Sequence, residues 1–562
     1  MHSRAHWFAD VSEERFVNVS RFLPEAASRV PHHRALAIPQ GREADGTIRY
    51  QNLTFRELSE KVDQAIHWLR SQGVDQGMLT LLMVKPGLEL ILLSFALFRM
   101  GAVPVVIDPG MGLKNFLNCV RTTRPDALVG IPLAHAVKAI FRKPFVSIEH
   151  SVSVPKGANF QRILANMPAS PAEPARTQSN DLAAILFTSG STGAPKGVCY
   201  EHAMFEAQVE MIRGEYDILP GEVDLPMLPI FALFNPAMGM TTVVPEMNPS
   251  KPATVDPTKI VQAIRQNEVT SSFGSPVLWN KIGRYCTQEG IQLPSLKRIL
   301  MAGAPVPPSI MRMFEKILPN GEIHTPYGAT ESLPVSTISA KRVLADTWKR
   351  TEIGAGTCVG QSFSQIDTRI IPLQEGPLET MDSVRSLPSG EIGELCVRGP
   401  VVTQKYNALP EATANAKIQD SDGGPSWHRM GDLAYIDAAK NIWFCGRMAE
   451  RVETAKDDYL YTDPCEAIAN QVDGVYRSAL IGLGAAPNQT PAMVIEPEPE
   501  AWPQNTSQKQ AFAKRVTEKL SEYAHTRNIQ KIFFEKNFPV DVRHNAKIHR
   551  LTLARKFNIS NR

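Results

Sequence analysis

The stretch Thr188-Ser189-Gly190-Ser191-Thr192-Gly193-Ala194-Pro195-Lys196-Gly197-Val198 follows a short apolar run, 182–187. The apolar run predicts a buried strand, and the Gly, Ser and Thr residues after it predict a tight loop. Small residues let backbone N–H groups converge on an anion, hydroxyls add donors, and Lys196 adds a positive charge. Four such residues alone would suit a flexible turn, whereas eleven in this order are far more specific. The spacing is not that of a Walker A loop. We therefore predict a loop that binds nucleotide phosphates.

Helical and strand patterns alternate on the amino-terminal side of this loop. Thr54 with Glu57 three residues later predicts a capping box that opens a helix. Short apolar runs predict strands at 79–84, 103–107 and 127–129. Such alternation favours a parallel sheet with crossover helices. We expect an α/β fold with a large, multi-sheet amino-terminal domain.

Other segments carry weaker patterns. Residues 16–35 predict a helix, and the stretch 155–174, rich in Pro, Ala and Ser, predicts a surface connection. Further along the chain, the patterns predict helices at 201–213 and 508–525 and strands at 479–483 and 531–534.

The composition excludes several classes of protein. A length of 562 residues suits two or more domains, and a net charge of +3 gives no reason to expect nucleic acid. Seven cysteines without a C-x-x-C pair are typical of free, mostly buried thiols in a reducing cytosol. The acidic start argues against a signal peptide, and the apolar run 88–107 is interrupted by charges, whereas a bilayer span needs roughly 20 nearly uncharged residues. We expect a cytoplasmic protein without a transmembrane segment, which acts on a small molecule.

A second motif, Thr325-Pro326-Tyr327-Gly328-Ala329-Thr330-Glu331, suits the rest of a nucleotide. Tyr327 offers a flat face for adenine, and Gly328 and Ala329 permit close approach of the backbone. Thr330 offers a hydroxyl to phosphate, and Glu331 offers a carboxylate, a hard ligand suited to Mg²⁺. A generic turn would explain Tyr-Gly alone, but not the full run.

Three further segments add candidate contacts. The predicted strand 299–301 runs into a turn at Gly303-Ala304-Pro305. In Gly431-Asp432-Leu433 the Asp432 carboxylate can accept hydrogen bonds from both ribose hydroxyls, although Gly-Asp-Leu alone is a common turn. The apolar, Pro-punctuated segment 224–240 predicts a core strand and the start of a helix. It is also a candidate wall for an acyl pocket, through Phe231, Ala232, Phe234 and Met238.

In this order, the motifs resemble those of the adenylate-forming superfamily, which includes acyl-CoA synthetases, peptide-synthetase adenylation domains and luciferases. The resemblance implies activation of a carboxylate as an acyl-AMP, with ATP and Mg²⁺ as cofactors. It implies that Arg447 contacts the ribose and that Lys547 is catalytic, together with Lys196 and Glu331. It further implies an AMP-binding domain over 1–446 and a small, mobile α+β lid over 447–562.

Three functions remain open for the step after adenylation. The sequence outside the shared motifs resembles that of the β-lactone synthetases of bacterial long-chain olefin biosynthesis, along essentially the full chain. This resemblance implies a 2-alkyl-3-hydroxy fatty acid as substrate. A long-chain acyl-CoA ligase is the alternative. A non-catalytic or carrier-dependent module is the third, and retention of Lys196, Glu331, Asp432 and Lys547 argues against a dead enzyme.

The sequence departs from the pattern of CoA ligases at three positions. Ala232 stands where these ligases commonly have a His after a Phe, and Glu453 and Lys456 stand where thioester-forming members have a Lys and a Gly. The glycine-bearing loop lines the thiol tunnel of CoA ligases. The departures therefore favour the β-lactone synthetases, whose resemblance also implies a thiolase, a reductase and a β-lactone decarboxylase as partner enzymes.

Overall fold

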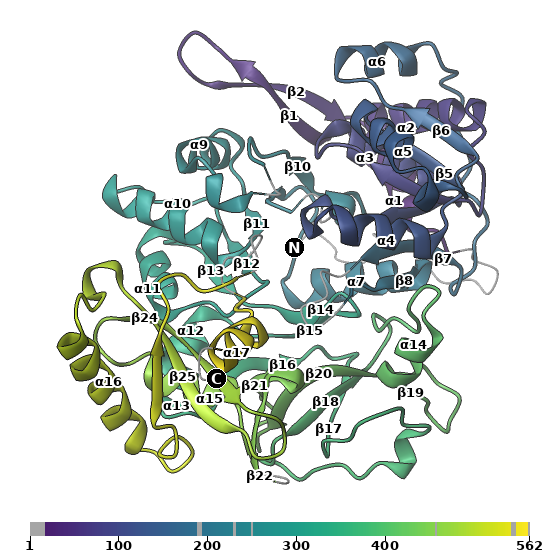
Figure 1. The fold of residues 1–562 in the computed structure, drawn as a ribbon. Helices are drawn as coiled ribbons and strands as arrows, with labels where there is room; N and C mark the ends of the chain where they lie inside the picture. The colour runs from purple at the N-terminus through teal and green to yellow at the C-terminus, as the bar shows by residue number, and fades with distance from the viewer. Residues whose placement is uncertain are drawn as a thin grey trace. The chain divides into compact units, whose positions relative to one another are not determined.

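The structure is a computed structural model that describes residues 17–187, 194–228, 232–248, 251–455, 458–540 and 547–559. By its internal contacts the chain divides into two compact units. The first comprises residues 1–34, 53–188 and 195–210, and the second comprises residues 35–52, 189–194 and 211–562. Each is α/β, as the sequence predicts (Figure 1).

The first unit is built on a six-stranded sheet. Its strands pair in parallel except for the antiparallel pair at one edge, β7 with β8. In spatial order the strands are β6 (His150–Ser153), β5 (Ala127–Gly130), β3 (Leu79–Met83), β4 (Val103–Val106), β7 (Leu182–Phe187) and β8 (Gly197–Glu201). The predicted parallel sheet and four of its strands are thus confirmed.

Helices precede, connect and follow these strands along the chain. The predicted capping box is present in α2, where Thr54 accepts from the Glu57 backbone and the Glu57 side chain accepts from Thr54. The apolar run 88–107 forms a buried helix, α3, followed by the predicted strand β4. The helices are α1 (Phe22–Arg29), α2 (Phe55–Ser71), α3 (Leu88–Arg99), α4 (Leu113–Thr123), α5 (Pro132–Ile140), α6 (Ala158–Ala165) and α7 (His202–Glu215).

The second unit begins with a seven-stranded sheet. One buried apolar cluster contains residues of this sheet and of three helices, α9 (Pro257–Asn267), α10 (Pro276–Gln288) and α11 (Pro308–Ile317). The strand order is β13 (Glu322–His324), β12 (Arg298–Met301), β11 (Ser271–Gly274), β9 (Val223–Pro226), β10 (Thr241–Val243), β1 (Arg34–Arg42) and β2 (Ile48–Thr54). The short helix α8 (Asn235–Met238) lies between β9 and β10, so the strand and helix start predicted within 224–240 are both present.

An eight-stranded sheet follows and carries most of the candidate site. Its strands are β14 (Tyr327–Ala329), β15 (Ser332–Thr337), β16 (Thr357–Ser362), β21 (Ile442–Arg447), β20 (Trp427–Ile436), β18 (Gly393–Arg398) and β17 (Asp367–Ile371), with β19 (Lys417–Ile418) beside β20. The associated helices are α12 (Ala340–Arg342), α13 (Trp348–Glu352) and α14 (Pro410–Ala416).

The carboxyl-terminal segment has its own small sheets. The strands β22 (Val452–Ala455) and β23 (Asp458–Leu460) pair with each other, and β24 (Val475–Leu483), β25 (Thr490–Pro497) and β26 (Lys531–Phe534) form a three-stranded sheet. The helices are α15 (Thr462–Ala469), α16 (Thr506–Ser521) and α17 (Arg550–Ile559). Two buried apolar clusters draw their buried members from 452–557 alone, and a larger cluster draws its buried members from 37–445.

Two local predictions were wrong. Residues 16–35 do not form one helix, because α1 ends at Arg29 and β1 starts at Arg34. The stretch 155–174 contains α6, which buries Phe160 and Leu164. Gly431-Asp432-Leu433, which alone would suit a common turn, lies within the long strand β20. In the last two cases tertiary packing decides the local structure, since both segments bury side chains.

The state of the thiols and the apolar length of the helices can be read from the structure. All seven cysteines are free and buried. None of the helices in the described part of the chain is both long and apolar enough to cross a membrane.

Candidate active site

The second motif forms a tight β-hairpin. Tyr327 pairs with Ser336 and Ala329 pairs with Ser332 across β14 and β15. A Cβ atom on Gly328 would come within 2.6 Å of the Ser332 carbonyl oxygen, so this position requires glycine. The neighbouring strand therefore explains the glycine, while the close approach of this backbone to a nucleotide stays a prediction.

Asp432 and Arg447 lie opposite each other on β20 and β21. Arg447 Nη1 is 2.8 Å from Asp432 Oδ1, and the Tyr327 hydroxyl donates to Oδ2. Among the described residues no donor forms a hydrogen bond with Oδ1, although Asp432 is only 2% exposed. A buried carboxylate oxygen that lacks a hydrogen bond is suited to accept one from a ribose hydroxyl.

The electrostatics of Asp432 connect it to the other predicted residues. Burial raises the pKa of the Asp432 carboxyl, while Arg447, the Tyr327 hydroxyl and Lys547 act in the opposite direction. Burial and the adjacent Asp432 raise the pKa of Tyr327, so its phenol stays protonated and donates. Lys547 is half-buried and close enough to act on Asp432. The structure thus brings Tyr327, Asp432, Arg447 and Lys547 together.

Glu331 lies in the turn of the same hairpin, and both its carboxylate and its backbone carbonyl accept hydrogen bonds. The Tyr406 hydroxyl donates to Glu331 Oε1 at 2.8 Å. The backbone N–H and the hydroxyl of Thr403 both donate to the Glu331 carbonyl oxygen, at 3.0 and 3.1 Å. The carboxylate also acts electrostatically on Asp432 and Arg447, so Glu331 belongs to the same cluster.

The residues around Glu331 suit a Mg²⁺ ion that is bound through a single protein carboxylate. Within the described ranges no three His, Cys, Asp or Glu side chains form a group that could hold a metal ion. Nor does any described Lys or Arg form an ion pair with Glu331 at 4.0 Å or less. A single carboxylate without a cationic side chain in contact suits Mg²⁺, which proteins bind through one or two carboxylates together with substrate phosphates.

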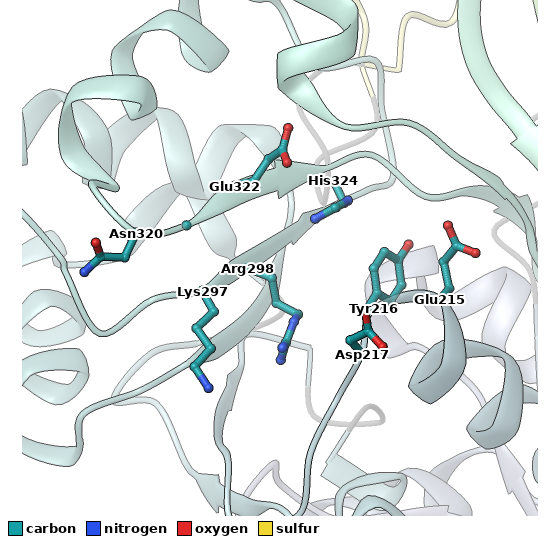
Figure 2. A pocket seen from close by; sticks show the side chains of 9 residues that line it. Glu215, Tyr216, Asp217, Lys297, Arg298, Asn320, Glu322 and His324 are labelled. Carbon is teal, nitrogen blue, oxygen red and sulfur yellow. The ribbon is translucent and has the colours of Figure 1, made fainter. Parts of the chain in front are cut away.

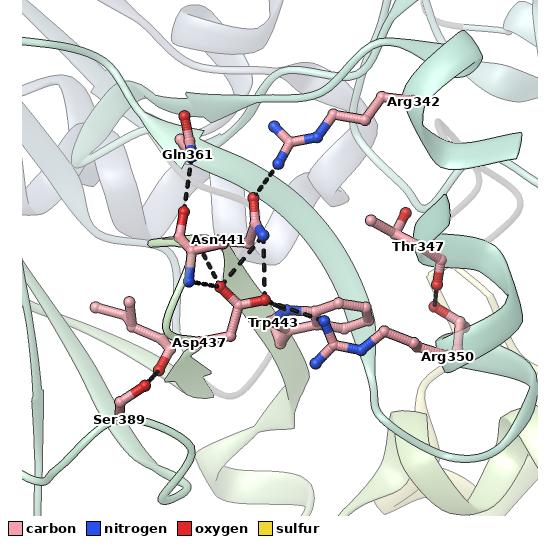
Figure 3. A network of polar contacts seen from close by, with 11 residues as sticks. Arg342, Thr347, Arg350, Gln361, Ser389, Asp437, Asn441 and Trp443 are labelled. Atoms are coloured by element: carbon pink, nitrogen blue, oxygen red, sulfur yellow. Dashed lines mark hydrogen bonds and ion pairs between the residues drawn. The ribbon is translucent and has the colours of Figure 1, made fainter. Parts of the chain in front are cut away.

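A polar network fixes the turn between β20 and β21 (Figure 3). Asp437 Oδ2 accepts hydrogen bonds from Trp443 Nε1 at 2.9 Å and from Asn441 and Arg350 at 3.1 Å. The Arg350 guanidinium also lies 4.1 Å from the centre of the Trp443 ring. Burial alone would raise the pKa of Asp437, but these hydrogen bonds outweigh it and lower the pKa to about 2. The hairpin that carries Asp432 and Arg447 is thereby fixed at its other end.

The remaining predicted nucleotide contacts are partly described. Gly303-Ala304-Pro305 follows the carboxyl end of β12, and Gly303 has a φ of +95°, which explains the glycine. Lys196 lies just before β8 in the first unit. The loop residues Thr188, Ser189, Gly190, Ser191, Thr192 and Gly193 lie outside the described residues.

The predicted acyl-pocket residues are partly described as well. Ala232, Phe234 and Met238 are buried in and around α8, whereas Phe231 lies outside the described residues. Of the two departures near the start of the predicted lid, Glu453 lies in β22, where its backbone N–H donates to Gln489 Oε1 at 3.0 Å. Lys456 lies outside the described residues.

A separate polar cavity of about 410 Å³ lies beside the amino ends of β12 and β13 (Figure 2). Lys297, Arg298, Glu322 and His324 line it together with Tyr216. Arg298 is already paired with Glu222 at 2.6 Å. None of the predicted site residues lines this cavity, so it is distinct from the Tyr327–Asp432 cluster.

Sequence reasoning missed three residues around Glu331, namely Thr403, Tyr406 and Lys417. Burial lowers the pKa of the Lys417 ammonium to about 7, against the opposing effect of Glu331. The sequence carried no signal for Lys417, because it stands in a polar segment, where a Lys is normally exposed. Nothing local linked Thr403 or Tyr406 to Glu331, which lies more than 70 residues earlier in the chain.

Known proteins resemble the chain over most of its length. Residues 23–407 match the family described as AMP-binding enzyme. The chain is 40% identical to an olefin beta-lactone synthetase of Xanthomonas campestris pv. campestris over 547 residues, which cover 96% of this chain and 97% of that protein. It is also 40% identical to an olefin beta-lactone synthetase of Stenotrophomonas maltophilia over 552 residues, with the same coverage.

Solved structures agree on the fold. ATP-bound MatB from Rhodopseudomonas palustris superposes with a TM-score of 0.76 at 18% identity and covers 97% of this chain and 100% of its own. The amide bond synthetase McbA from Marinactinospora thermotolerans gives a TM-score of 0.75 at 20% identity, over 96% and 100% of the two chains. The chain therefore belongs to the AMP-binding enzyme family and, within it, to the group of the olefin beta-lactone synthetases.

Proposed function

We propose that the chain is an ATP-dependent β-lactone synthetase, which acts on a 2-alkyl-3-hydroxy fatty acid in long-chain olefin biosynthesis. The observation that carries the proposal is the 40% identity to two olefin beta-lactone synthetases over 96% of the chain. The cluster around Asp432 supports it, because Tyr327, Glu331, Asp432, Arg447 and Lys547 meet within one unit.

The first step is adenylation. A carboxylate oxygen of the acid attacks the α-phosphorus of ATP, and pyrophosphate leaves. Charge develops on the phosphate oxygens, so positioned cations and donors supply most of the catalysis. We assign this role to Lys547 and Lys196, ribose binding to Asp432 and Arg447, and adenine stacking to Tyr327. Glu331 would hold Mg²⁺, which supplies further neutralisation of phosphate charge.

The second step is intramolecular. The β-hydroxyl oxygen attacks the acyl carbon, the bond from that carbon to the phosphate oxygen breaks, and the β-lactone, AMP and a proton are released. An internal nucleophile held in line can gain roughly 7–11 kcal/mol over a bimolecular encounter, which helps to offset the strain of a four-membered ring. The adenylate supplies the good leaving group that ring closure needs.

We also propose that residues 447–562 form a mobile lid over an AMP-binding domain of residues 1–446. The separate apolar clusters on the two sides of this boundary support the division. Seven buried free thiols support a cytoplasmic location. Assembly with a thiolase, a reductase and a β-lactone decarboxylase is a further proposal, which rests on the resemblance to the olefin beta-lactone synthetases.

Adenylation and ring closure can be distinguished by comparing an acid that has the β-hydroxyl with one that lacks it. Pyrophosphate and AMP release would be measured without CoA for a 2-alkyl-3-hydroxy acid and for the matched 3-deoxy acid. We expect steady release of both products from the hydroxy acid. From the deoxy acid we expect a single burst of pyrophosphate with little AMP, because no internal nucleophile closes the cycle. Equal steady AMP release from both acids, or release only with CoA, would contradict the proposal.

A further inference from the structure

Lys417 is a buried lysine in the short strand β19, where its backbone pairs with that of His428 in β20. It is 4% exposed, and none of the described carboxylates lies within 4.0 Å of its Nζ as an ion-pair partner. Burying a charge without a counter-charge in contact costs free energy. Stability alone therefore does not account for a lysine at this position.

The contacts of Lys417 lead towards Glu331. Its Nζ donates to the backbone carbonyl of Thr403 and lies 3.4 Å from the Thr403 hydroxyl. That hydroxyl and the Thr403 N–H both donate to the Glu331 carbonyl oxygen. One threonine thus links the buried ammonium to the backbone of the carboxylate residue.

A second connection reaches Glu331 from the same segment. Tyr406, three residues after Thr403, donates to Glu331 Oε1 at 2.8 Å. The N–H of Tyr406 in turn donates to the Thr413 hydroxyl at 3.0 Å, which ties this segment to α14. Thr403 and Tyr406 therefore hold Glu331 by its backbone carbonyl and by its carboxylate, and Lys417 contacts Thr403.

We propose that Lys417 is a positioning residue, which acts through Thr403 to place the Glu331 carboxylate for Mg²⁺ and the phosphates of ATP. The inference rests on the proposed role of Glu331. Groups that orient a metal-binding carboxylate commonly change metal affinity by about 10–100-fold when they are removed. Lys417 does not touch the substrate, so its loss should change metal dependence rather than nucleotide recognition in general.

The test compares Lys417→Met with Lys405→Met. The first substitution replaces the buried ammonium by an unbranched apolar side chain, and the second makes the same chemical change at an exposed position in the same region. Binding of ATP would be measured by calorimetry over a series of Mg²⁺ concentrations, and binding of AMP would be measured without Mg²⁺. Thermal unfolding would be recorded for each variant.

We expect Lys417→Met to raise the Mg²⁺ concentration needed for half-maximal ATP affinity by about tenfold. AMP affinity should change less than about twofold, and Lys405→Met should match the wild type. An unchanged Mg²⁺ dependence in Lys417→Met, or an equal loss of AMP affinity, would overturn the inference. So would ATP binding in the wild type that does not depend on Mg²⁺.

A second variant serves if Lys417→Met fails to fold. Thr403→Val removes the hydroxyl that joins Lys417 to Glu331 and keeps the side-chain volume. A raised Mg²⁺ requirement in this variant supports the inference, and an unchanged requirement overturns it. Neither measurement depends on the product, so a wild type that makes acyl-CoA would refute the proposed function without touching this inference.

Discussion

Asp432 and Arg447 face each other across β20 and β21, with Arg447 Nη1 2.8 Å from Asp432 Oδ1. The two residues are cross-strand partners, so the backbone ladder fixes their separation before any ligand binds. The pair leaves Oδ1 without a hydrogen bond among the described residues. Its geometry therefore explains how a buried carboxylate can pair with an arginine and still accept a hydrogen bond from a ligand.

Replacing Asp432 by Ala should weaken ATP binding. Hydrogen bonds to a charged group contribute roughly 1.5–3 kcal/mol each, so the apparent ATP affinity should fall by at least about tenfold. Calorimetric titration with ATP would measure it, and thermal unfolding would show whether loss of the partner of Arg447 disturbs the fold. An unchanged ATP affinity would mean that Asp432 does not bind the ribose.

Replacing Lys547 by Ala should act on the rate instead. If Lys547 meets the α-phosphate only as charge develops, kcat for adenylation should fall by about 10²–10³ while KM for ATP changes little. Pyrophosphate release would measure this, with Lys536→Ala as a control at an exposed lysine of the same region. A variant with normal kcat and a raised KM would contradict a role in the transition state.

Replacing Asp437 by Asn should lower stability. A pKa lowered from 3.8 to about 2 corresponds to roughly 2 kcal/mol of stabilisation. This stabilisation is fully present above pH 3.8 and is lost as the pH falls through about 2, because the unfolded chain binds the proton first.

Denaturant unfolding at pH 7, followed by tryptophan fluorescence, would measure the difference. Asp473→Asn changes the same group at an exposed position and should match the wild type. Equal unfolding of Asp437→Asn and wild type would show that the network in Figure 3 does not stabilise the hairpin.

The buried side chain of His202 should make the stability of the first unit depend on pH. Its Nδ1 accepts from the Val19 N–H at 3.4 Å, and burial lowers its pKa from 6.5 to about 4, against the opposing effect of Asp181. Between these values the unfolded chain binds a proton that the folded chain does not. Stability should therefore fall as the pH drops from 6.5 towards 4, by about 2 kcal/mol between pH 7 and pH 5.

The measurement is denaturant unfolding of the wild type and of His202→Asn at pH 7 and pH 5. Asn can still accept the hydrogen bond but does not titrate, so the difference between the two pH values should shrink. His33→Asn, at an exposed histidine, should leave that difference as it is. A wild type whose stability does not change between these pH values would contradict the assignment.

The sequence predicted those parts of the fold that depend on local patterns. The strand Leu182–Phe187 and the capping box at Thr54 follow from neighbouring residues alone, and both are present. The candidate site could be predicted only through ordered motifs, because the cluster joins residues as far apart as Tyr327 and Lys547.

The rest depends on contacts that no local pattern records. Gly431-Asp432 looks like a turn, yet β20 runs through it because β18 and β21 supply partners on both sides. Nothing in its own segment indicates a role for Lys417, and the role is inferred only from its contact with Thr403. Polar networks between distant strands are set by tertiary packing, which overrides local preference.

The most direct measurement for the account as a whole is mass spectrometry of the organic product. The enzyme would be supplied with ATP, Mg²⁺ and a 2-alkyl-3-hydroxy fatty acid, with CoA either absent or in excess. We predict a β-lactone, with the mass of the acid less one water, in the same yield under both conditions. An acyl-CoA product, or no lactone without CoA, would contradict the account and identify the chain as an acyl-CoA ligase.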